Sequence, residues 1–396
     1  MSDQTHFEVV CDSARLEEIC RRFADSAFVA VDTEFIRETT FWARLCLIQM
    51  ATPDFAVIVD PLADDLNLAP FFELLRNERV TKVFHAARQD VEIFVKLADT
   101  VPKPLFDTQV AAMVCGYGDQ ISYDQLVHRI TGARIDKTSR YTDWQRRPLS
   151  DKQLNYAISD VTHLCEVYLS LKANLEEQGR VDWVAEELAV LNDIETYRTH
   201  PENAWKRLKM RVKKPRQLAV MQKVAAWREQ EAQARDMPRQ RILKDDAIYE
   251  IALQQPQNGE QMARLRSLPR GFERSQSAQA LIAAVEEALA IDDADLPRLP
   301  KTRPAPEHAS AAAELLKVLL KMVAERHGVA ARLIATVDDL EKLAADDNAD
   351  VAALKGWRFQ LFGKKALALK RGETALFLGR GKVRTVNLED LPVAAE

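Results

Sequence analysis

Two acidic residues, Asp32 and Glu34, lie two positions apart at the end of an apolar run, in the segment Val31-Asp32-Thr33-Glu34-Phe35. If the run is a strand, its period of two directs both side chains to one face, where they can share a metal ion. Taken alone, the pair has a simpler interpretation as a solvated strand end. It indicates metal chemistry only if other acids join it.

A tyrosine and an aspartate supply the next candidate pair, in Asn155-Tyr156-Ala157-Ile158-Ser159-Asp160. On a helix, the spacing of four residues places Tyr156 and Asp160 on the same face. A phenol and a carboxylate would then meet in one neighbourhood. A core tyrosine beside a surface acid is the simpler interpretation of this pair alone.

Between these pairs, Asp90 opens an amphipathic segment just after the apolar Val83-Phe84. An acid at that position can simply complement a helix dipole, and the same holds for Asp107 in Leu105-Phe106-Asp107-Thr108. His85 is a candidate general base, but a histidine that packs at a strand end is favoured. Gln49 could line a groove or face the interior, and both interpretations stay open.

The segments VDTEF, HAARQD, LFDT and YAISD follow one another in the chain. Their order and residue types resemble the three exonuclease motifs of the DEDD superfamily, in the subgroup whose third motif carries tyrosine. With the helical second half, the chain resembles the ribonuclease D family over nearly its full length. The resemblance implies an α/β RNase H-like exonuclease domain, with a mixed sheet flanked by helices, followed by two all-α HRDC-like domains.

The resemblance also implies the chemistry of the site, which is 3′→5′ hydrolysis of RNA to 5′-mononucleotides. Asp32 would bridge two divalent ions, Glu34 and Asp160 would complete the site that activates water, and Asp90 would hold the second ion, partly through water. Such ions can activate water and neutralise the leaving oxygen. Carboxylates without a Cys or His cluster suit Mg²⁺ or Mn²⁺. Tyr156 would orient the water, because an unperturbed phenol, with a pKa of about 10, is a poor base.

Apolar patterns predict the elements that position these residues. Short runs rich in β-branched residues predict hairpin-connected antiparallel strands at 28–32, 45–50 and 55–59. A further strand is predicted at 82–84, and helices are predicted at 68–76 and 88–97. A mixed sheet with helices is typical of the α/β class.

From about residue 151 onward, apolar spacings of three and four predict a nearly continuous series of helices. A proline-rich stretch interrupts them. We expect an exonuclease domain over 1–200, a first HRDC-like helical domain with a basic leading segment over 201–292, a linker over 293–307, and a second, divergent HRDC-like domain over 308–396.

The net charge is −5, yet residues 205–216 carry seven basic side chains and no acidic one. Local positive charge of this kind is typical of phosphate binding, although charge runs are often solvated. Basic residues also surround the turn at 236–238. The predicted RNA-binding residues are Lys206, Arg207, Lys209, Arg211, Lys213, Lys214, Arg235, Arg239 and Arg241.

Five scattered cysteines without a CxxC pair indicate a reducing compartment, and neither a signal peptide nor a membrane span is predicted. We therefore expect a soluble, cytoplasmic monomer. The resemblance implies RNA with a single-stranded 3′ end as substrate, with precursors of tRNA as the cellular target. Two alternatives stay open: a 3′→5′ DNA exonuclease, and a catalytically silent RNA-binding scaffold. The intact set of acids argues against the second.

Overall fold

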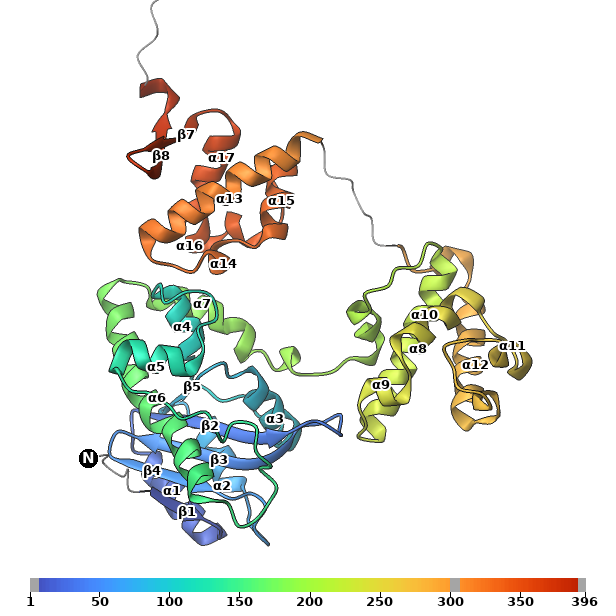
Figure 1. The fold of residues 1–396 in the computed structure, drawn as a ribbon, viewed down its shortest axis with the longest axis horizontal. Helices are drawn as coiled ribbons and strands as arrows, with labels where there is room; N and C mark the ends of the chain where they lie inside the picture. Colours follow the sequence, from blue (N-terminus) through green and yellow to red (C-terminus); the bar gives the residue numbers. More distant parts are fainter. Residues whose placement is uncertain (1–6, 300–306, 391–396) are drawn as a thin grey trace, which may run out of the picture. The chain divides into compact units, whose positions relative to one another are not determined.

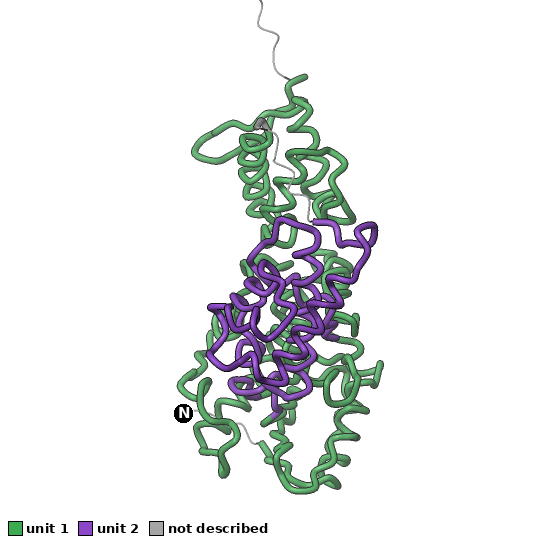
Figure 2. Tube along the Cα trace, turned by 90° about the vertical axis from the view of Figure 1, so that its right-hand side faces the viewer, with its two compact units in different colours: residues 1–34, 46–196, 303–396 green, residues 35–45, 197–302 purple. Residues whose placement is uncertain are grey.

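The computed structural model describes residues 7–299 and 307–390, and these fall into two compact units (Figures 1 and 2). The first unit comprises residues 1–34, 46–196 and 303–396, and the second comprises residues 35–45 and 197–302. Each unit is described by itself. Among the described residues, no helix is both long and apolar enough to span a membrane.

A six-stranded mixed sheet organises the first half of the chain. The strands are β1 (Phe7–Val10), β2 (Phe28–Ile36), β3 (Arg44–Thr52), β4 (Phe55–Val59), β5 (Thr81–Phe84) and β6 (Leu105–Asp107), in the order β1-β4-β3-β2-β5-β6. Strands β3 and β4 pair antiparallel, whereas β2 pairs parallel with β5 and β5 pairs parallel with β6. The predicted strands and the mixed sheet are confirmed.

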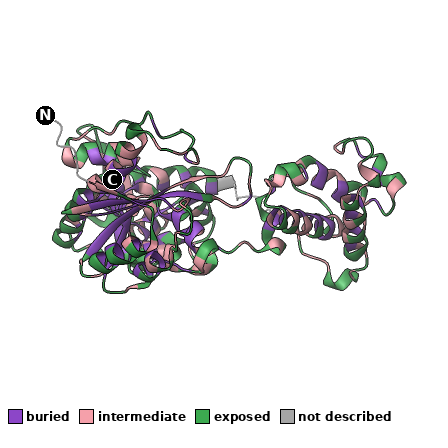
Figure 3. Ribbon diagram, turned by 90° about the horizontal axis from the view of Figure 1, so that it is seen from below, coloured by how far each residue is buried: buried purple, intermediate pink, exposed green. Residues whose placement is uncertain are grey.

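Helices cover this sheet, so its central strands are buried along much of their length (Figure 3). Residues 28–31 of β2 and 45–51 of β3 form continuous buried runs, as expected for strands covered on both faces. The helices are α1 (Ser13–Phe23), α2 (Ala69–Arg76), α3 (Arg88–Ala98), α4 (Thr108–Val114), α5 (Tyr123–Thr131), α6 (Asp151–Glu177) and α7 (Val181–Asn192). The predictions for α2 and α3 are confirmed.

The last part of the chain forms a helical cluster within the first unit. Its helices are α13 (Glu307–His327), α14 (Ala331–Ile334), α15 (Val337–Ala345), α16 (Gly356–Arg358) and α17 (Lys364–Lys370). The cluster packs on α7, where the rings of Trp183 and Trp357 stack at a centroid distance of 4.4 Å. Beside them, Arg358 is buried and pairs with both Glu186 and Glu187.

This cluster ends in a hairpin of β7 (Thr374–Gly379) and β8 (Lys382–Asn387), which the sequence pattern did not predict. The expected all-α domain is therefore helical through α17 and then turns to strand. Arg380 and Gly381, the two residues of the turn, both have positive φ, at 53° and 76°. Two-residue turns of this conformation match the twist of paired strands.

The second unit is a small helical bundle of α8 (Pro215–Ala234), α9 (Arg239–Ile242), α10 (Asp245–Gln254), α11 (Gly259–Ala263) and α12 (Gln276–Leu289). Leu218, Val224, Ile248 and Leu281 are among its buried core residues. Of the predicted linker 293–307, residues 300–306 lie outside the described residues.

One ion pair fixes the segment that leads into α6. Arg147 donates to both carboxylate oxygens of Asp60, each at 2.6 Å, and also to the carbonyl oxygens of Cys46 and Trp144. Asp60 is 8% exposed. The guanidinium thus ties the chain before α6 to the sheet.

We expect Asp60→Asn to lower the free energy of unfolding by about 2–3 kcal/mol, because it leaves the Arg147 guanidinium in a partly buried site without its counter-charge. Chemical denaturation followed by circular dichroism measures this loss. Glu17→Gln is the control: it removes an exposed pair with Arg21 and should change stability by at most about 0.5 kcal/mol. Equal stability of the two variants would contradict this role for Asp60.

Candidate active site

Strand β2 presents Asp32 and Glu34 just beyond its buried run. Thr33 lies between them and is buried. The Thr33 hydroxyl donates a hydrogen bond to the carboxylate of Asp90. Strand β2 therefore contributes two acids and also holds a third.

A strained turn after β5 places Asp90 in the first turn of α3. Ala86 lies in this turn with φ of 60°, a conformation that non-glycine residues rarely adopt. The Asp107 carboxylate accepts hydrogen bonds from the backbone nitrogens of Ala86 and Ala87, at 3.0 and 2.9 Å. It also caps α4 through the nitrogen of Gln109. Asp107 is thus a clamp on the turn that presents Asp90.

Helix α6 supplies Tyr156 and Asp160. The helix begins at a capping box in which Ser150 and Gln153 exchange hydrogen bonds, so its first turn is well defined. Tyr156 hydrogen-bonds the carboxylate of Asp160 through its hydroxyl, and Asp160 is 7% exposed. The predicted position of both residues on one helix face is confirmed.

Burial raises the pKa of all four acids, and the charges of neighbouring acids raise those of Asp32 and Glu34 further. Burial, followed by the charges of Asp160, Asp90 and Glu34, raises the pKa of Asp32 well above its usual range. Burial and the charges of Asp160 and Asp90 raise the pKa of Glu34 to about 9. Burial raises the pKa of Asp90 and that of Asp160 to about 7 each, against the hydrogen bonds from Thr33 and Tyr156.

This arrangement suits a hard divalent cation, because all the donors are carboxylate oxygens. A bound cation would also offset the repulsion between the ionised acids. Within 7–299 and 307–390, no group of three or more His, Cys, Asp or Glu side chains is placed to hold a metal ion. The Asp90 carboxylate is instead turned to Thr33. The acids fit a metal by the chemistry of their oxygen donors.

Two residues near the acids were missed by the sequence analysis. Arg140 is exposed, and its charge lowers the pKa of Glu34, Tyr156 and Asp160. Tyr123 donates a hydrogen bond from its hydroxyl to the carbonyl oxygen of Ser159, at 3.2 Å, and its pKa is raised by burial and by Asp160 and Asp32. Neither lies in a recognisable motif, so only the fold brings them to the site.

The side chains of His85 and Gln49 both lie in the protein interior. The ring nitrogens of His85 lie 3.0 Å from the Thr108 hydroxyl and 3.2 Å from the carbonyl oxygen of Ile121. Burial lowers the pKa of His85, which therefore favours the neutral ring. Gln49 is fully buried. These positions agree with the interpretation of His85 as a packing residue and place Gln49 in the core.

The predicted RNA-binding residues divide into two groups in the second unit. Arg239 donates to both carboxylate oxygens of Glu229, at 2.6 and 2.5 Å, and Arg207 lies 3.3 Å from the same carboxylate. Arg239 also covers the ring of Phe41. By contrast, several other basic side chains of the segment are exposed, among them Lys206, Lys209, Lys213, Lys214 and Arg241.

Known proteins share this combination of an exonuclease-like sheet domain and a helical domain. Residues 7–176 match the family model described as 3′-5′ exonuclease, and residues 217–285 match that described as HRDC domain. Ribonuclease D of Nitrobacter hamburgensis is 57% identical over 95% of this chain and 98% of its own length. Ribonuclease D of Bartonella henselae is 49% identical over 96% of this chain and 94% of its own.

A solved structure agrees with these relatives. The crystal structure of Escherichia coli RNase D, described as an exoribonuclease involved in structured RNA processing, matches with a TM-score of 0.80 and 26% identity. The match covers 93% of this chain and 99% of that one. Membership of this exonuclease family implies dependence on divalent metal and an RNA substrate. The chain therefore belongs to the ribonuclease D family of 3′→5′ exoribonucleases.

Proposed function

We propose that Asp32, Glu34, Asp90 and Asp160 hold two divalent ions, Mg²⁺ or Mn²⁺, and that the chain releases 5′-mononucleotides from RNA 3′ ends at this site. The observation that carries the proposal is that four carboxyl groups, of which Asp90 and Asp160 are buried and Asp32 and Glu34 half-buried, lie near one another with the pKa of each raised. Bound ions of this kind supply Lewis acidity for the attacking water and for the leaving oxygen.

Tyr156 positions the attacking water and is not the base. Burial, with the charges of Asp160, Glu34 and Asp32, raises the pKa of its phenol. The hydroxyl therefore keeps its proton at neutral pH and acts as a hydrogen-bond donor. Arg140 adds a positive charge beside Glu34 and Asp160, which suits it to hold a phosphate of the strand.

The substrate we propose is a tRNA precursor with a single-stranded 3′ end. The description of the Escherichia coli enzyme as a processor of structured RNA supports this choice. The exposed basic side chains at 206–214 and at 235–241 would contact phosphates, which position a strand without reading its sequence. In Arg207 and Arg239, the contact with Glu229 would orient the guanidinium.

We further propose that the chain acts as a cytoplasmic monomer of three domains. They are an exonuclease domain over 1–200, an HRDC-like domain over 201–292 and a divergent HRDC-like domain over 308–396. None of the five cysteines, all of which lie within the described residues, forms a disulfide, which fits a reducing compartment. The match of residues 217–285 to the HRDC family supports the middle domain.

Tyr156→Phe should lower kcat about 100-fold or more while RNA affinity changes little, because the variant loses only the hydrogen bond that positions the water. Single-turnover hydrolysis gives the rate, and fluorescence anisotropy without divalent metal gives the affinity. Tyr249→Phe removes a phenol in the second unit and serves as the control. Wild-type turnover by Tyr156→Phe would exclude it from the mechanism.

Metal should stabilise the protein more at pH 8 than at pH 6. Because the folded-state pKa values of the acids are raised, their contribution to stability is present at low pH and is lost as pH rises through about 7 for Asp90 and Asp160. Saturating Mg²⁺ or Mn²⁺ offsets the repulsion, by about 2.7 kcal/mol at 100 times Kd. Differential scanning fluorimetry measures the shift in Tm.

Asp32→Asn should raise the Tm of the metal-free protein at pH 8 and reduce the shift with metal. Asp54→Asn, at an exposed position outside the acid cluster, should leave both values unchanged. A metal-induced shift that is the same in wild type and Asp32→Asn would contradict the assignment.

Timed digestion of a 3′-extended tRNA precursor with Mg²⁺ tests the substrate. Wild type should shorten the extension by single nucleotides, and Asp160→Asn should be slower by at least about 100-fold, because a metal ligand and the partner of Tyr156 are lost together. A DNA strand of the same sequence is the comparison. Equal products from wild type and Asp160→Asn would refute the site, and preferential cleavage of the DNA would refute the substrate.

A further inference from the structure

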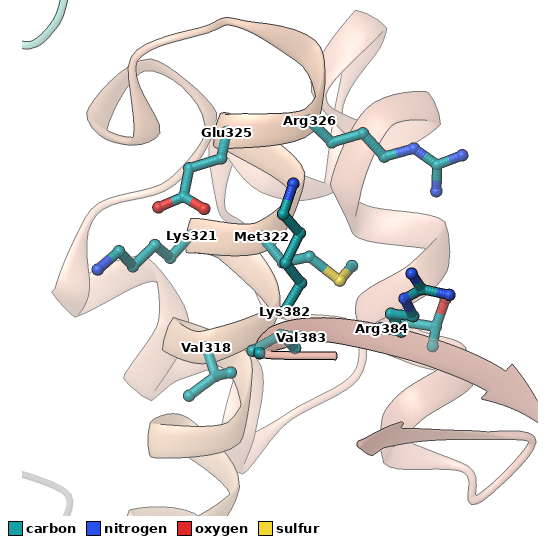
Figure 4. A pocket seen from close by; sticks show the side chains of 10 residues that line it. Val318, Lys321, Met322, Glu325, Arg326, Lys382, Val383 and Arg384 are labelled. Carbon is teal, nitrogen blue, oxygen red and sulfur yellow. The ribbon is translucent and has the colours of Figure 1, made fainter. Parts of the chain in front are cut away.

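A second basic surface lies in the last part of the chain, between α13 and β8 (Figure 4). It is a hollow of about 770 Å³, which we call the α13–β8 groove. Val318, Met322 and Val383 provide its apolar lining. Its charged side chains come from both elements: Lys321, Glu325 and Arg326 from α13, and Lys382 and Arg384 from β8.

The four cations of the groove are exposed and lack counter-charges. Among the described residues, no carboxylate forms an ion pair with Lys321, Arg326, Lys382 or Arg384, and Glu325 is the single acid of the lining. Other lysines of the same cluster are paired: Lys317 with Glu314, Lys342 with Asp338, Lys355 with Asp350 and Lys370 with Asp347. The groove therefore gathers cations without ion-pair partners, whereas these other lysines of the cluster are neutralised by acids.

Neighbouring groups respond to this charge. The pKa of His327 is lowered by burial and then by the charges of Lys365, Arg326 and Arg180. Burial and the charge of Arg326 also lower the pKa of Lys365. Lys365 and Arg180 thus add positive charge near the end of α13, beside Arg326 of the groove, which strengthens attraction for an anionic ligand.

An exposed aromatic side chain lies on the same hairpin. Phe377 is directly opposite Arg384 in the pairing of β7 with β8, so the two side chains share a face of the hairpin. A Cβ placed on Gly379 would come within 3.1 Å of both Phe377 and Arg384, so the two side chains converge over this glycine. Phe377 is 46% exposed. Cations beside an exposed ring are typical of single-strand binding.

We propose that the α13–β8 groove binds the phosphate backbone of the RNA substrate, with Phe377 stacking on a base. The inference rests on the proposed function, which supplies RNA as the polyanion. Lys321 and Arg326 on one wall and Lys382 and Arg384 on the other hold successive phosphates. The open face of Phe377 accepts any base, so the groove adds affinity without sequence preference.

The test uses the full chain and the double variant Lys382→Ser/Arg384→Ser. Binding of a long fluorescein-labelled RNA with a single-stranded 3′ tail is measured by anisotropy in EDTA, which keeps the RNA intact. We expect Kd to rise about 10-fold, and the slope of log Kd against log salt to fall by about 1.4, since each phosphate contact on a single strand contributes roughly 0.7. Phe377→Ser should raise Kd while leaving the slope unchanged.

Matched variants separate charge from folding. Lys342→Ser/Lys355→Ser removes two cations of the same cluster that already have acidic partners, and should bind RNA as wild type does. Lys382→Arg/Arg384→Lys keeps both charges and should retain most of the affinity. Loss of affinity in all of these variants would show a folding effect and overturn the proposal.

Hydrolysis distinguishes this inference from the function on which it rests. The ratio of kcat/KM for the long RNA to that for a trinucleotide should fall in Lys382→Ser/Arg384→Ser. Wild-type Kd, salt slope and ratio in this variant would overturn the groove while leaving the exoribonuclease intact. A wild-type protein that binds the RNA but hydrolyses neither substrate would refute the proposed function alone. Loss of binding to phosphatidylserine vesicles with unchanged RNA binding would assign the groove to a membrane.

Discussion

The repulsion between four neighbouring carboxyl groups, two buried and two half-buried, is the constraint on which the first unit depends. In an unfolded chain in water, the like charges of these four acids would keep them apart. In the folded chain, each belongs to an element that packs into the core, namely β2 for Asp32 and Glu34, α3 for Asp90 and α6 for Asp160. Their raised pKa values express the cost of this arrangement. Perturbed acids that lie together are a typical feature of functional sites. A cation that balances the charge converts the same repulsion into affinity.

The acids of this unit differ in what faces them, and the difference separates function from scaffolding. Asp107 receives backbone N–H groups from Ala86, Ala87 and Gln109, and Asp60 receives the guanidinium of Arg147. Both therefore have donors that stabilise their charge. Among the four candidate ligands, Asp90 and Asp160 each have one hydroxyl donor, Thr33 and Tyr156, and no cation pairs with any of the four among the described residues. Asp107 holds the turn before α3, and Asp60 holds the segment before α6. These two acids therefore stabilise the elements that bring the four candidate ligands together.

Local patterns in the sequence predicted pairs of residues, whereas their convergence depended on the fold. The period of two on β2 correctly placed Asp32 beside Glu34, and the helical period placed Tyr156 beside Asp160. Neither pattern reveals that β2 and α6 bring these pairs together, and that expectation came from the order of the motifs. Arg140 has no motif and reaches the acids only in the folded chain. The hairpin that turns at Arg380-Gly381 was missed because helices were expected to the end of this segment, although Val383, Thr385 and Val386 are β-branched residues that favour strands.

The number of basic residues in a segment indicates phosphate binding less well than the presence or absence of acidic partners. The run at 205–216 is rich in basic residues, but Arg207 contacts the buried Glu229, and Arg216 pairs with Asp293 at 2.5 Å. The α13–β8 groove has fewer cations, yet its four lack acidic partners among the described residues. A cation already paired in the folded protein must lose or share that partner to bind phosphate, whereas an unpaired one loses only water. Unpaired cations on a fixed surface are thus the stronger indication of a polyanion site, even in a chain whose net charge is −5.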